Sequence, residues 1–370
     1  MNNPVAVVGF NTAGCIPFHL KALLASGHPF AFFGSKKLYE LATLEWPNVG
    51  HVQTYFSEGT RNSTEEFLWL EKTVSLHPEI ETVYFMEVER FRKEIIQAKW
   101  TKKFPVLGKR RLRGNLFPRP CFYNRHTFRD KLAFFKWQIW GFFARFSIER
   151  HGLLVIDSHY KKLFPILRAI PNGMKLLRES PEPYDRVLVP DKVSRACDSN
   201  PPSILFFGHH TKRKGTCWAL RALEAFSTPL RVIIAGQSDD EPLVRQLCEA
   251  LPPHITPELL LQRISDETKE VLFKRASIIM LPYEVFLGSS GLVFEAMIYG
   301  RKVLASDICA VDERLLKSNA VNLYRVGDDK DFLRQLSNCL GSVPDFQGVE
   351  TFLSEHGIEK FAQAVLPTQN

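Results

Sequence analysis

The chain of 370 residues lacks the apolar segments and the cysteine patterns that are typical of membrane-spanning or secreted proteins. No run of about eighteen uncharged apolar residues is present, and the first residues lack the basic and then apolar pattern of a signal peptide. The seven cysteines are scattered, include no CxxC pair and are odd in number, which argues against a disulfide framework. We therefore expect a cytoplasmic protein with reduced thiols. The length predicts two domains, because a single compact core rarely grows so large.

The GxGxxG fingerprint of dinucleotide-binding proteins is also missing, although the chain opens with the pattern of a strand, a helix and a second strand. Residues 5–9 are a valine-rich run typical of a buried parallel strand, residues 11–14 form the turn after it, and residues 30–34 make the second strand. Gly9 and Gly14 have the wrong spacing for the fingerprint. This opening predicts an α/β domain and gives little support to a dinucleotide cofactor.

A strand, a small polar loop, a helix and another strand follow one another between residues 277 and 305. The apolar run 277–281 stops at Pro282, and Gly300 stands where a helix C-cap is expected. The loop presents backbone N–H groups and the positive end of a helix dipole, which suit a phosphate, and Glu295 in the helix is placed to reach ribose hydroxyls. An N-capping serine and a solvated glutamate explain the same residues equally well. The loop residues are Gly288, Ser289, Ser290 and Gly291.

These residues resemble family 4 of the nucleotide-sugar glycosyltransferases, which have the GT-B fold. That family has a strand ended by proline, a glycine loop, a Glu-Ala-Met helix, a glycine, and a strand that begins with Pro-Val or Lys-Val. The same order is found here in Pro282, Gly288, residues 295–297, Gly300 and residues 302–303. The family normally has a second glutamate eight positions before the one matched by Glu295. That position is Leu287 here, and Glu284 lies three residues further upstream.

The start of the expected second domain supports the same resemblance. Residues 203–208 read as a strand, and a basic turn with a Lys-Gly pair at Lys214 follows. The family has a Gly-Arg pair and then a Lys-Gly pair here, whose arginine and lysine hold the donor diphosphate. Lys214 matches the lysine, His209 replaces the arginine, and Lys212 or Arg213 can supply the missing charge. A solvated basic turn is the alternative. The resemblance implies a donor site made of Gly208, His209, Arg213, Lys214, Glu284, Gly288, Ser289, Ser290, Gly291 and Glu295.

Two loops of the first domain are candidates for the acceptor side of the reaction. In GT-B enzymes the first loop faces the cleft between the domains, so the resemblance places Asn11, Thr12 and Gly14 beside the acceptor or the transferred sugar. Residues 82–86 read as a strand, and Glu87 follows its carboxyl end, where α/β folds bind ligands. We interpret Glu87, as a base, and Asn11 as the candidate catalytic residues. The alternative is that acidic residues close this strand next to neighbouring arginines.

Positive charge is concentrated between residues 90 and 150, where seventeen Lys and Arg stand against three acidic residues, although the whole chain has a net charge of +8. Residues 99–123 combine such cations with aromatic residues and prolines, which predicts mostly irregular structure. Residues 130–146 read as a helix with one narrow polar stripe and aromatic residues over most of its remaining surface. The stripe consists of Asp130, Lys131, Gln138 and Arg145.

We interpret residues 99–146 as a surface that contacts an anionic membrane or a lipid diphosphate. A packed helix with a solvated basic loop is one alternative. Nucleic-acid binding is another, because phosphates attract cations and bases stack on aromatic rings. No recognisable nucleic-acid-binding module surrounds the segment, so no nucleic-acid partner is expected. The membrane interpretation predicts a cytoplasmic protein that is peripheral on the inner face of a membrane.

These patterns predict an α/β protein with the GT-B fold, in which two Rossmann-like domains face each other across a cleft. We expect an acceptor-side domain of residues 1–199, with a basic-aromatic insertion at about 99–146, and a nucleotide-sugar-binding domain of residues 200–370. The resemblance implies a glycosyltransferase that moves a sugar from a nucleotide-diphosphate sugar to a glycan or lipid-linked acceptor, as in polysaccharide biosynthesis. It also implies retention at the anomeric carbon, with no cofactor and no metal.

Two alternatives of other classes stay open, because Leu287 and His209 stand where functional residues are expected. One is a non-catalytic GT-B subunit that binds a sugar nucleotide. The other is a GT-B sugar-nucleotide epimerase, which shares the fold and needs acid and base groups instead of an acceptor site.

Overall fold

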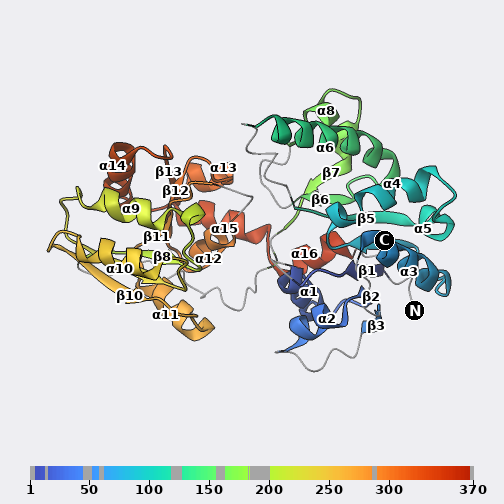
Figure 1. Ribbon diagram of the computed structural model, residues 1–370, viewed down its shortest axis with the longest axis horizontal. Helices are drawn as coiled ribbons and strands as arrows, with labels where there is room; N and C mark the ends of the chain where they lie inside the picture. The colour runs from blue at the N-terminus through green and yellow to red at the C-terminus, as the bar shows by residue number, and fades with distance from the viewer. Residues whose placement is uncertain are drawn as a thin grey trace. The chain divides into compact units, whose positions relative to one another are not determined.

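The computed structural model describes residues 5–12, 16–44, 52–57, 62–117, 127–155, 163–181, 183, 201–285 and 290–366. The chain divides into two compact units (Figure 1). Unit 1 comprises Met1–Tyr184 and His356–Asn370, and unit 2 comprises Asp185–Glu355. No helix in the described parts of the chain has the length and apolar character needed to cross a membrane.

The described residues of unit 1 form a seven-stranded parallel sheet with the strand order β3-β2-β1-β4-β5-β6-β7. β1 is valine-rich and buried along its whole length, as expected for a strand covered on both faces. The strands are β1 (Val5–Gly9), β2 (Phe30–Gly34), β3 (Val52–Phe56), β4 (Thr82–Phe85), β5 (Arg111–Leu116), β6 (Leu153–Val155) and β7 (Leu177–Glu179).

Helices cover both faces of this sheet, because alternate residues of each strand point to opposite sides. Val5, Val7 and Phe32 lie in a core with α1, α2 and α16, whereas Ala6 and Val8 lie in a second core with α3 to α6 and α8. The helices are α1 (Ile16–Ala25), α2 (Lys36–Thr43), α3 (Ser63–Ser75), α4 (Arg92–Trp100), α5 (Pro105–Lys109), α6 (Phe128–Ser147), α8 (Pro165–Arg168) and α16 (Ile358–Val365), with the 3-10 turns η1 (Val88–Arg90) and η3 (Gly173–Leu176).

The last helix of the chain belongs to unit 1, which corrects the expected domain of residues 200–370. α16 buries Phe361 and Val365 in the same core as Leu20 and Leu23 of α1. In addition, the buried Arg113 donates a hydrogen bond of 3.1 Å to the carbonyl of Ala364. An amphipathic helix is stable wherever its apolar face is covered, and here that cover is α1. The expected boundary at residues 199–200 lies outside the described residues.

The expected basic-aromatic insertion at 99–146 is also corrected, because its middle is a central strand of the sheet. β5 pairs with β4 on one side and β6 on the other. Leu112 and Leu116 are buried in the core, and Arg113 is buried with its Nε 3.6 Å from a carboxylate oxygen of Glu149. Arginines at alternate positions hid this strand in the sequence, since they read as solvated loop residues.

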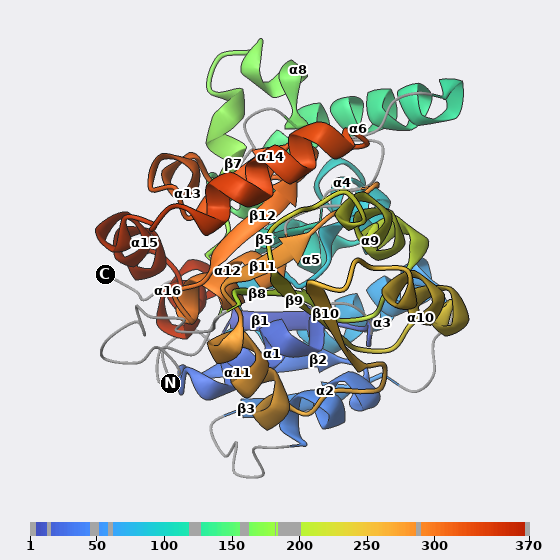
Figure 2. The same cartoon turned by 90° about the vertical axis from the view of Figure 1, so that its left-hand side faces the viewer.

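The described residues of unit 2 form a six-stranded parallel sheet with the order β10-β9-β8-β11-β12-β13 (Figures 1 and 2). Residues of α9, α10 and α14 share one core with the sheet, and these helices lie to the left of β8 and β11 in Figure 1, with α12 on the right. The strands are β8 (Ser203–Phe207), β9 (Leu230–Ala235), β10 (Ile255–Leu260), β11 (Ile278–Leu281), β12 (Lys302–Ser306) and β13 (Val321–Tyr324).

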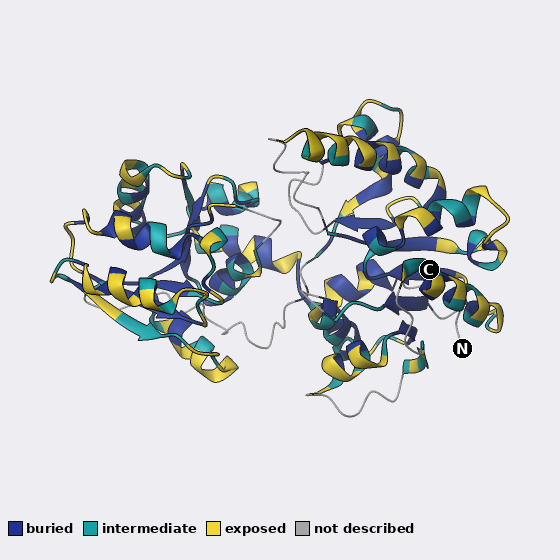
Figure 3. Ribbon diagram, in the orientation of Figure 1, coloured by how far each residue is buried: buried dark blue, intermediate teal, exposed yellow. Residues whose placement is uncertain are grey.

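The other elements of unit 2 follow the alternating β and α order of a doubly wound sheet. Figure 3 shows that the inner strands of both units are mostly buried, whereas the edge strands β3 and β10 include exposed residues and most helices keep an exposed side. The helices are α9 (Thr216–Leu223), α10 (Glu241–Glu249), α11 (Asp266–Arg275), α12 (Gly291–Ile298), α13 (Glu313–Lys317), α14 (Asp329–Leu340) and α15 (Phe346–Ser354), with the 3-10 turn η5 (Lys212–Lys214).

Candidate functional site

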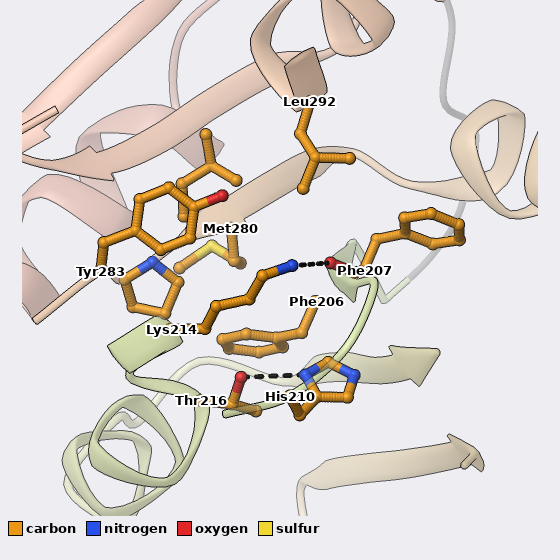
Figure 4. Close-up of a pocket in the computed structure, with 10 residues that line it drawn as sticks. Phe206, Phe207, His210, Lys214, Thr216, Met280, Tyr283 and Leu292 are labelled. Carbon is orange, nitrogen blue, oxygen red and sulfur yellow. Dashed lines mark hydrogen bonds between the residues drawn. The ribbon is translucent and has the colours of Figure 1, made fainter. Parts of the chain in front are cut away.

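A small pocket lies where the strand order of unit 2 reverses. The chain passes from β8 to β9 on one side and from β11 to β12 on the other, so the connections after β8 and β11 run in opposite directions along the sheet from neighbouring strand ends. Ligands of parallel α/β sheets bind at this kind of place, at the carboxyl edge. The space between the loops after these two strands is small and is lined by residues of both loops. Its lining consists of Phe206, Phe207, His210, Lys214, Thr216, Met280, Leu281, Pro282, Tyr283 and Leu292 (Figure 4).

A glycine lets the two loops meet at this pocket. Gly215 has φ +68°, and a Cβ there would lie 1.8 Å from the carbonyl oxygen of Pro282. Only glycine combines this left-handed conformation with such a close approach. The carbonyl of Arg213 also accepts a hydrogen bond of 2.9 Å from the backbone N–H of Glu284. The Lys-Gly pair that the sequence singled out therefore fixes the approach of the loop after β11.

Lys214 crosses the pocket, with Leu292 on one side and Phe206 and His210 on the other (Figure 4). Among the described residues, its ammonium donates one long hydrogen bond, 3.5 Å to the carbonyl of Phe207. Burial lowers the pKa of Lys214, and the neighbouring charge of Arg213 lowers it further. The ammonium is thus a half-buried cation with little compensation, and an anion in the pocket would supply that compensation.

His210 lines this pocket, and the neighbouring His209, which was expected in the donor site, does not. Burial, with the charge of Lys214 as the next cause, lowers the pKa of His210 to about 4, so the ring is neutral at pH 7. Its Nδ1 lies 3.0 Å from Oγ1 of Thr216, and its buried Nε2 has no hydrogen-bond partner among the described residues. His209 is more than half exposed and pairs with Asp239 at 2.7 Å.

No local pattern in the sequence separates His210 from His209. Gly208 interrupts the extended backbone with a φ of +94°, and His210 beyond it pairs with Ser238. Phe206 and Phe207 both line the pocket, so the alternation of side chains along β8 does not tell which histidine faces it.

The loop after β11 contributes an aromatic residue and the start of α12. The hydroxyl of Tyr283 lies 3.0 Å from Oγ of Ser290, and the guanidinium of Arg213 lies 5.6 Å from the centre of the Tyr283 ring. Ser290 precedes α12 without a side-chain capping bond, so the N-capping alternative does not describe it. A Cβ at Gly291, the first helical residue, would meet open space. Gly288 and Ser289 lie outside the described residues.

Glu295 is held by a lysine that the sequence did not single out. Glu295 lies one helical turn beyond Leu292, which lines the pocket. Its Oε1 is 3.2 Å from Nζ of Lys269, and that ammonium is also 3.1 Å from Asp266. The side chain of Glu284 is exposed, and its backbone N–H donates the hydrogen bond to the carbonyl of Arg213 that joins the two loops.

The first unit has its own reversal of strand order, between β1 and β4. The loops after these strands bring together the two candidate catalytic residues, since Nδ2 of Asn11 donates a hydrogen bond of 3.0 Å to Oε1 of Glu87. Arg90 makes two hydrogen bonds of 2.6 Å to the buried carboxylate of Glu66, an ion pair that sequence reasoning missed. Thr12 lies in the same first loop, and Gly14 is outside the described residues.

α6 carries an apolar stripe that faces solvent. Gln138, which was expected in a polar stripe, is buried instead and donates a hydrogen bond of 2.8 Å to the carbonyl of Leu163. The buried side of the helix includes Trp137 and Trp140. The exposed apolar side chains of α6 are Phe128, Leu132, Phe135, Ile139, Phe143 and Phe146, and Trp100 of α4 packs edge-on against the last two.

Comparison with known proteins identifies the fold. Residues 201–342 match the family described as Glycosyl transferases group 1. No curated protein matches the chain by sequence. Among solved structures, HepE of Anabaena in complex with UDP and glucose is 11% identical, with a TM-score of 0.64 and 97% of each chain covered. The lipopolysaccharide outer core galactosyltransferase WaaB is 14% identical, with a TM-score of 0.66 and 98% of this chain and 99% of that chain covered.

A third structure, sucrose-phosphate synthase from Thermosynechococcus elongatus, is 14% identical, with a TM-score of 0.64 over 97% of this chain and 96% of that chain. The structural similarity establishes the fold, and the low sequence identities leave the reaction open. The chain has the GT-B fold, with two α/β units that each contain a parallel sheet, and the family resemblance expected from the sequence is confirmed.

Proposed function

We propose that this GT-B protein, whose second unit carries the sequence pattern of glycosyl transferases group 1, transfers a sugar from a nucleoside-diphosphate sugar to an acceptor. The observation that carries the proposal is the poorly compensated ammonium of Lys214 in a pocket at the switch point of unit 2. Parallel α/β sheets bind ligands at this kind of place. HepE, which shares the fold, was solved with UDP and with UDP-glucose.

The charges around the pocket suit a departing diphosphate. Sugar transfer breaks the bond between the anomeric carbon and a diphosphate oxygen, so negative charge develops on the leaving group. Lys214 and the N-terminal amides of α12 would stabilise that charge, because both are in place before the reaction. Arg213, held beside the ring of Tyr283, is a candidate to replace the arginine that the family has at the position of His209. Because these groups supply positive charge, the proposal requires no metal.

For the acceptor we propose the carboxyl edge of the unit 1 sheet. Glu87 and Asn11 are hydrogen-bonded to each other there, and both side chains can contact sugar hydroxyls. Glu87 is the candidate base for an acceptor hydroxyl. Retention at the anomeric carbon follows from the family resemblance and remains part of the proposal.

A panel of nucleotide sugars tests this function. The purified protein is incubated with each donor, with and without glycan or lipid-linked acceptors, and the products are separated. Transfer, or slow hydrolysis that releases the nucleoside diphosphate, supports a glycosyltransferase. Formation of an epimeric sugar nucleotide would instead identify an epimerase, and binding without turnover would identify a non-catalytic subunit.

We further propose that α6 docks unit 1 on an anionic membrane, where a lipid-linked acceptor would be found. On a helical wheel the exposed apolar stripe has Lys131 on one side and Arg129 and Lys136 on the other, and all three are exposed. A helix with this layout lies in the membrane interface with its apolar side chains among the lipid chains. Each basic residue near an anionic surface adds about 1 kcal/mol, so charge and apolar area act together.

Co-sedimentation with vesicles tests the docking. Wild-type protein should sediment with vesicles rich in anionic lipid, less so as salt is raised, and the double variant Phe128→Ser with Phe135→Ser should stay in the supernatant. Leu68→Ser with Leu76→Ser is the matched control, since these leucines of the α3 region are also exposed but lie off the stripe. A wild-type protein that fails to sediment at low salt with strongly anionic vesicles would refute the docking.

A further inference from the structure

Lys269 on α11 joins two carboxylates at the edge of the candidate donor site. Its Nζ lies 3.2 Å from Glu295 on α12 and 3.1 Å from Asp266, one turn earlier on its own helix. The side chains of Lys269 and Glu295 are 25% and 32% exposed, so the pair is shielded on most sides, whereas Asp266 is 82% exposed. Burial alone would lower the pKa of Lys269, but the charges and hydrogen bonds of Glu295 and Asp266 outweigh it and raise that pKa.

The helix that carries Lys269 is fixed against the pocket. Phe273, one turn after Lys269, packs its ring 5.3 Å from that of Phe207, which lines the pocket, and 5.4 Å from Tyr299 at the end of α12. Ser265 caps the other end of α11 by accepting a hydrogen bond from the backbone N–H of Thr268. Lys269 therefore lies on a helix that packs against both the pocket-lining Phe207 and the end of α12.

We propose that Lys269 is a positioning residue for the donor nucleotide, which orients the carboxylate of Glu295 toward the ribose hydroxyls. This inference rests on the proposed function. Lys269 engages Oε1 of Glu295, and Oε2 accepts no hydrogen bond from any described residue, so that oxygen is available to a hydroxyl. Asp266 contacts the same ammonium at 3.1 Å, but its carboxylate is largely exposed, so solvent screens this contact.

Lys269 and Lys214 would then recognise different parts of the donor. Lys214 lies in the pocket and would meet the diphosphate, whereas Lys269 acts through Glu295, one helical turn further along α12. A partly exposed ion pair contributes little to folding, so a purely structural role predicts a small change in stability and no change in ligand preference. Preference for the ribose hydroxyls is the property that separates the two roles.

Calorimetry with UDP, GDP and their 2′,3′-dideoxy counterparts tests the inference. The wild-type protein should bind the ribonucleotide more tightly, and Lys269→Met should reduce this preference about tenfold while binding of the dideoxy nucleotide stays the same. Glu295→Gln should reduce the preference for the ribonucleotide by a similar factor, and the double variant should reduce it no further. Lys269→Arg should retain most of the preference. Melting of each variant without nucleotide verifies that it is folded.

The outcomes distinguish the inference from the function on which it rests. A Lys269→Met variant that binds nucleotides and keeps the wild-type preference for ribose would overturn the role of Lys269 and leave the donor site standing. A wild-type protein that binds none of the four nucleotides would overturn the proposed function, and the role of Lys269 with it. Asp266→Asn is the matched control, because it removes the exposed partner and leaves the contact with Glu295 in place.

Discussion

Replacement of Lys214 by methionine should weaken the binding of nucleoside diphosphates without destabilising the free protein. The ammonium is half-buried, and among the described residues its one hydrogen bond is 3.5 Å long. A charge-assisted hydrogen bond to a phosphate contributes about 1.5–3 kcal/mol. At about 1.4 kcal/mol for each factor of ten, Kd for UDP or GDP should rise roughly tenfold to a hundredfold.

The free energy of unfolding of the same variant should rise or stay unchanged. Because burial and then Arg213 lower the pKa of Lys214, folding disfavours its protonated form. The charged side chain therefore costs stability below its folded-state pKa, and this cost disappears only as pH rises toward the unfolded-state value. Methionine keeps most of the apolar stem and removes the charge, so the free energy of unfolding at pH 7 should be equal to or above that of the wild type.

Calorimetry with UDP and GDP, together with urea unfolding, measures both quantities. Lys212→Met is the matched control, because Lys212 belongs to the same turn but is exposed and does not line the pocket. It should leave Kd nearly unchanged. The assignment of Lys214 fails if its methionine variant binds both diphosphates as the wild type does, or if it loses several kcal/mol of stability.

Three further predictions concern two buried histidines and two glycines. Burial lowers the pKa of His210 to about 4 and that of His19 to about 3. Between pH 6.5 and about 4 the unfolded chain therefore binds protons that the folded chain does not. The free energy of unfolding should fall as the pH drops through this range. When the free energy of unfolding is measured by urea at each pH, it should depend less steeply on pH in His210→Asn than in the wild type. An unchanged pH dependence would contradict the neutral His210 ring. Gly27→Ala, at φ +71° with no atom within 4 Å of the new Cβ, should cost about 1–2 kcal/mol. Gly215→Ala, at φ +68°, should reduce the free energy of unfolding by more than Gly27→Ala and should abolish UDP binding, because its Cβ meets Pro282. Equal melting temperatures of the two variants would contradict this account.

The sequence by itself determined the strands β8 and β11, which flank the candidate donor pocket, and the helices that follow their loops. Continuous apolar runs such as 203–207 and 278–281 have one stable solution, a parallel strand covered on both faces, and each was found where the pattern indicated. The Lys-Gly pair at residues 214–215 was also singled out from the sequence by its family pattern, and the left-handed φ of +68° at its glycine came from the structure. The apolar runs depend on local chemistry, so they can be read without knowing the neighbours.

Only the tertiary structure decided which of two adjacent side chains faces the pocket. His209 and His210 have the same chemistry, and their burial differs because one lies against α9 while the other pairs with the exposed Asp239. In the same way, Lys269 became part of the site because α11 packs beside α12. Pairings between residues 26 positions apart leave no periodic trace in the sequence.

The faces of amphipathic elements were likewise decided by packing. Gln138 reads as solvent-exposed on a wheel, but the carbonyl of Leu163 gives its amide a buried partner, so the aromatic side of α6 faces outward. α16 follows the second unit in the sequence, yet its apolar face is covered by α1 of the first. Hydrophobic periodicity tells how wide an apolar face is, and which surface covers that face depends on contacts between segments far apart in the chain.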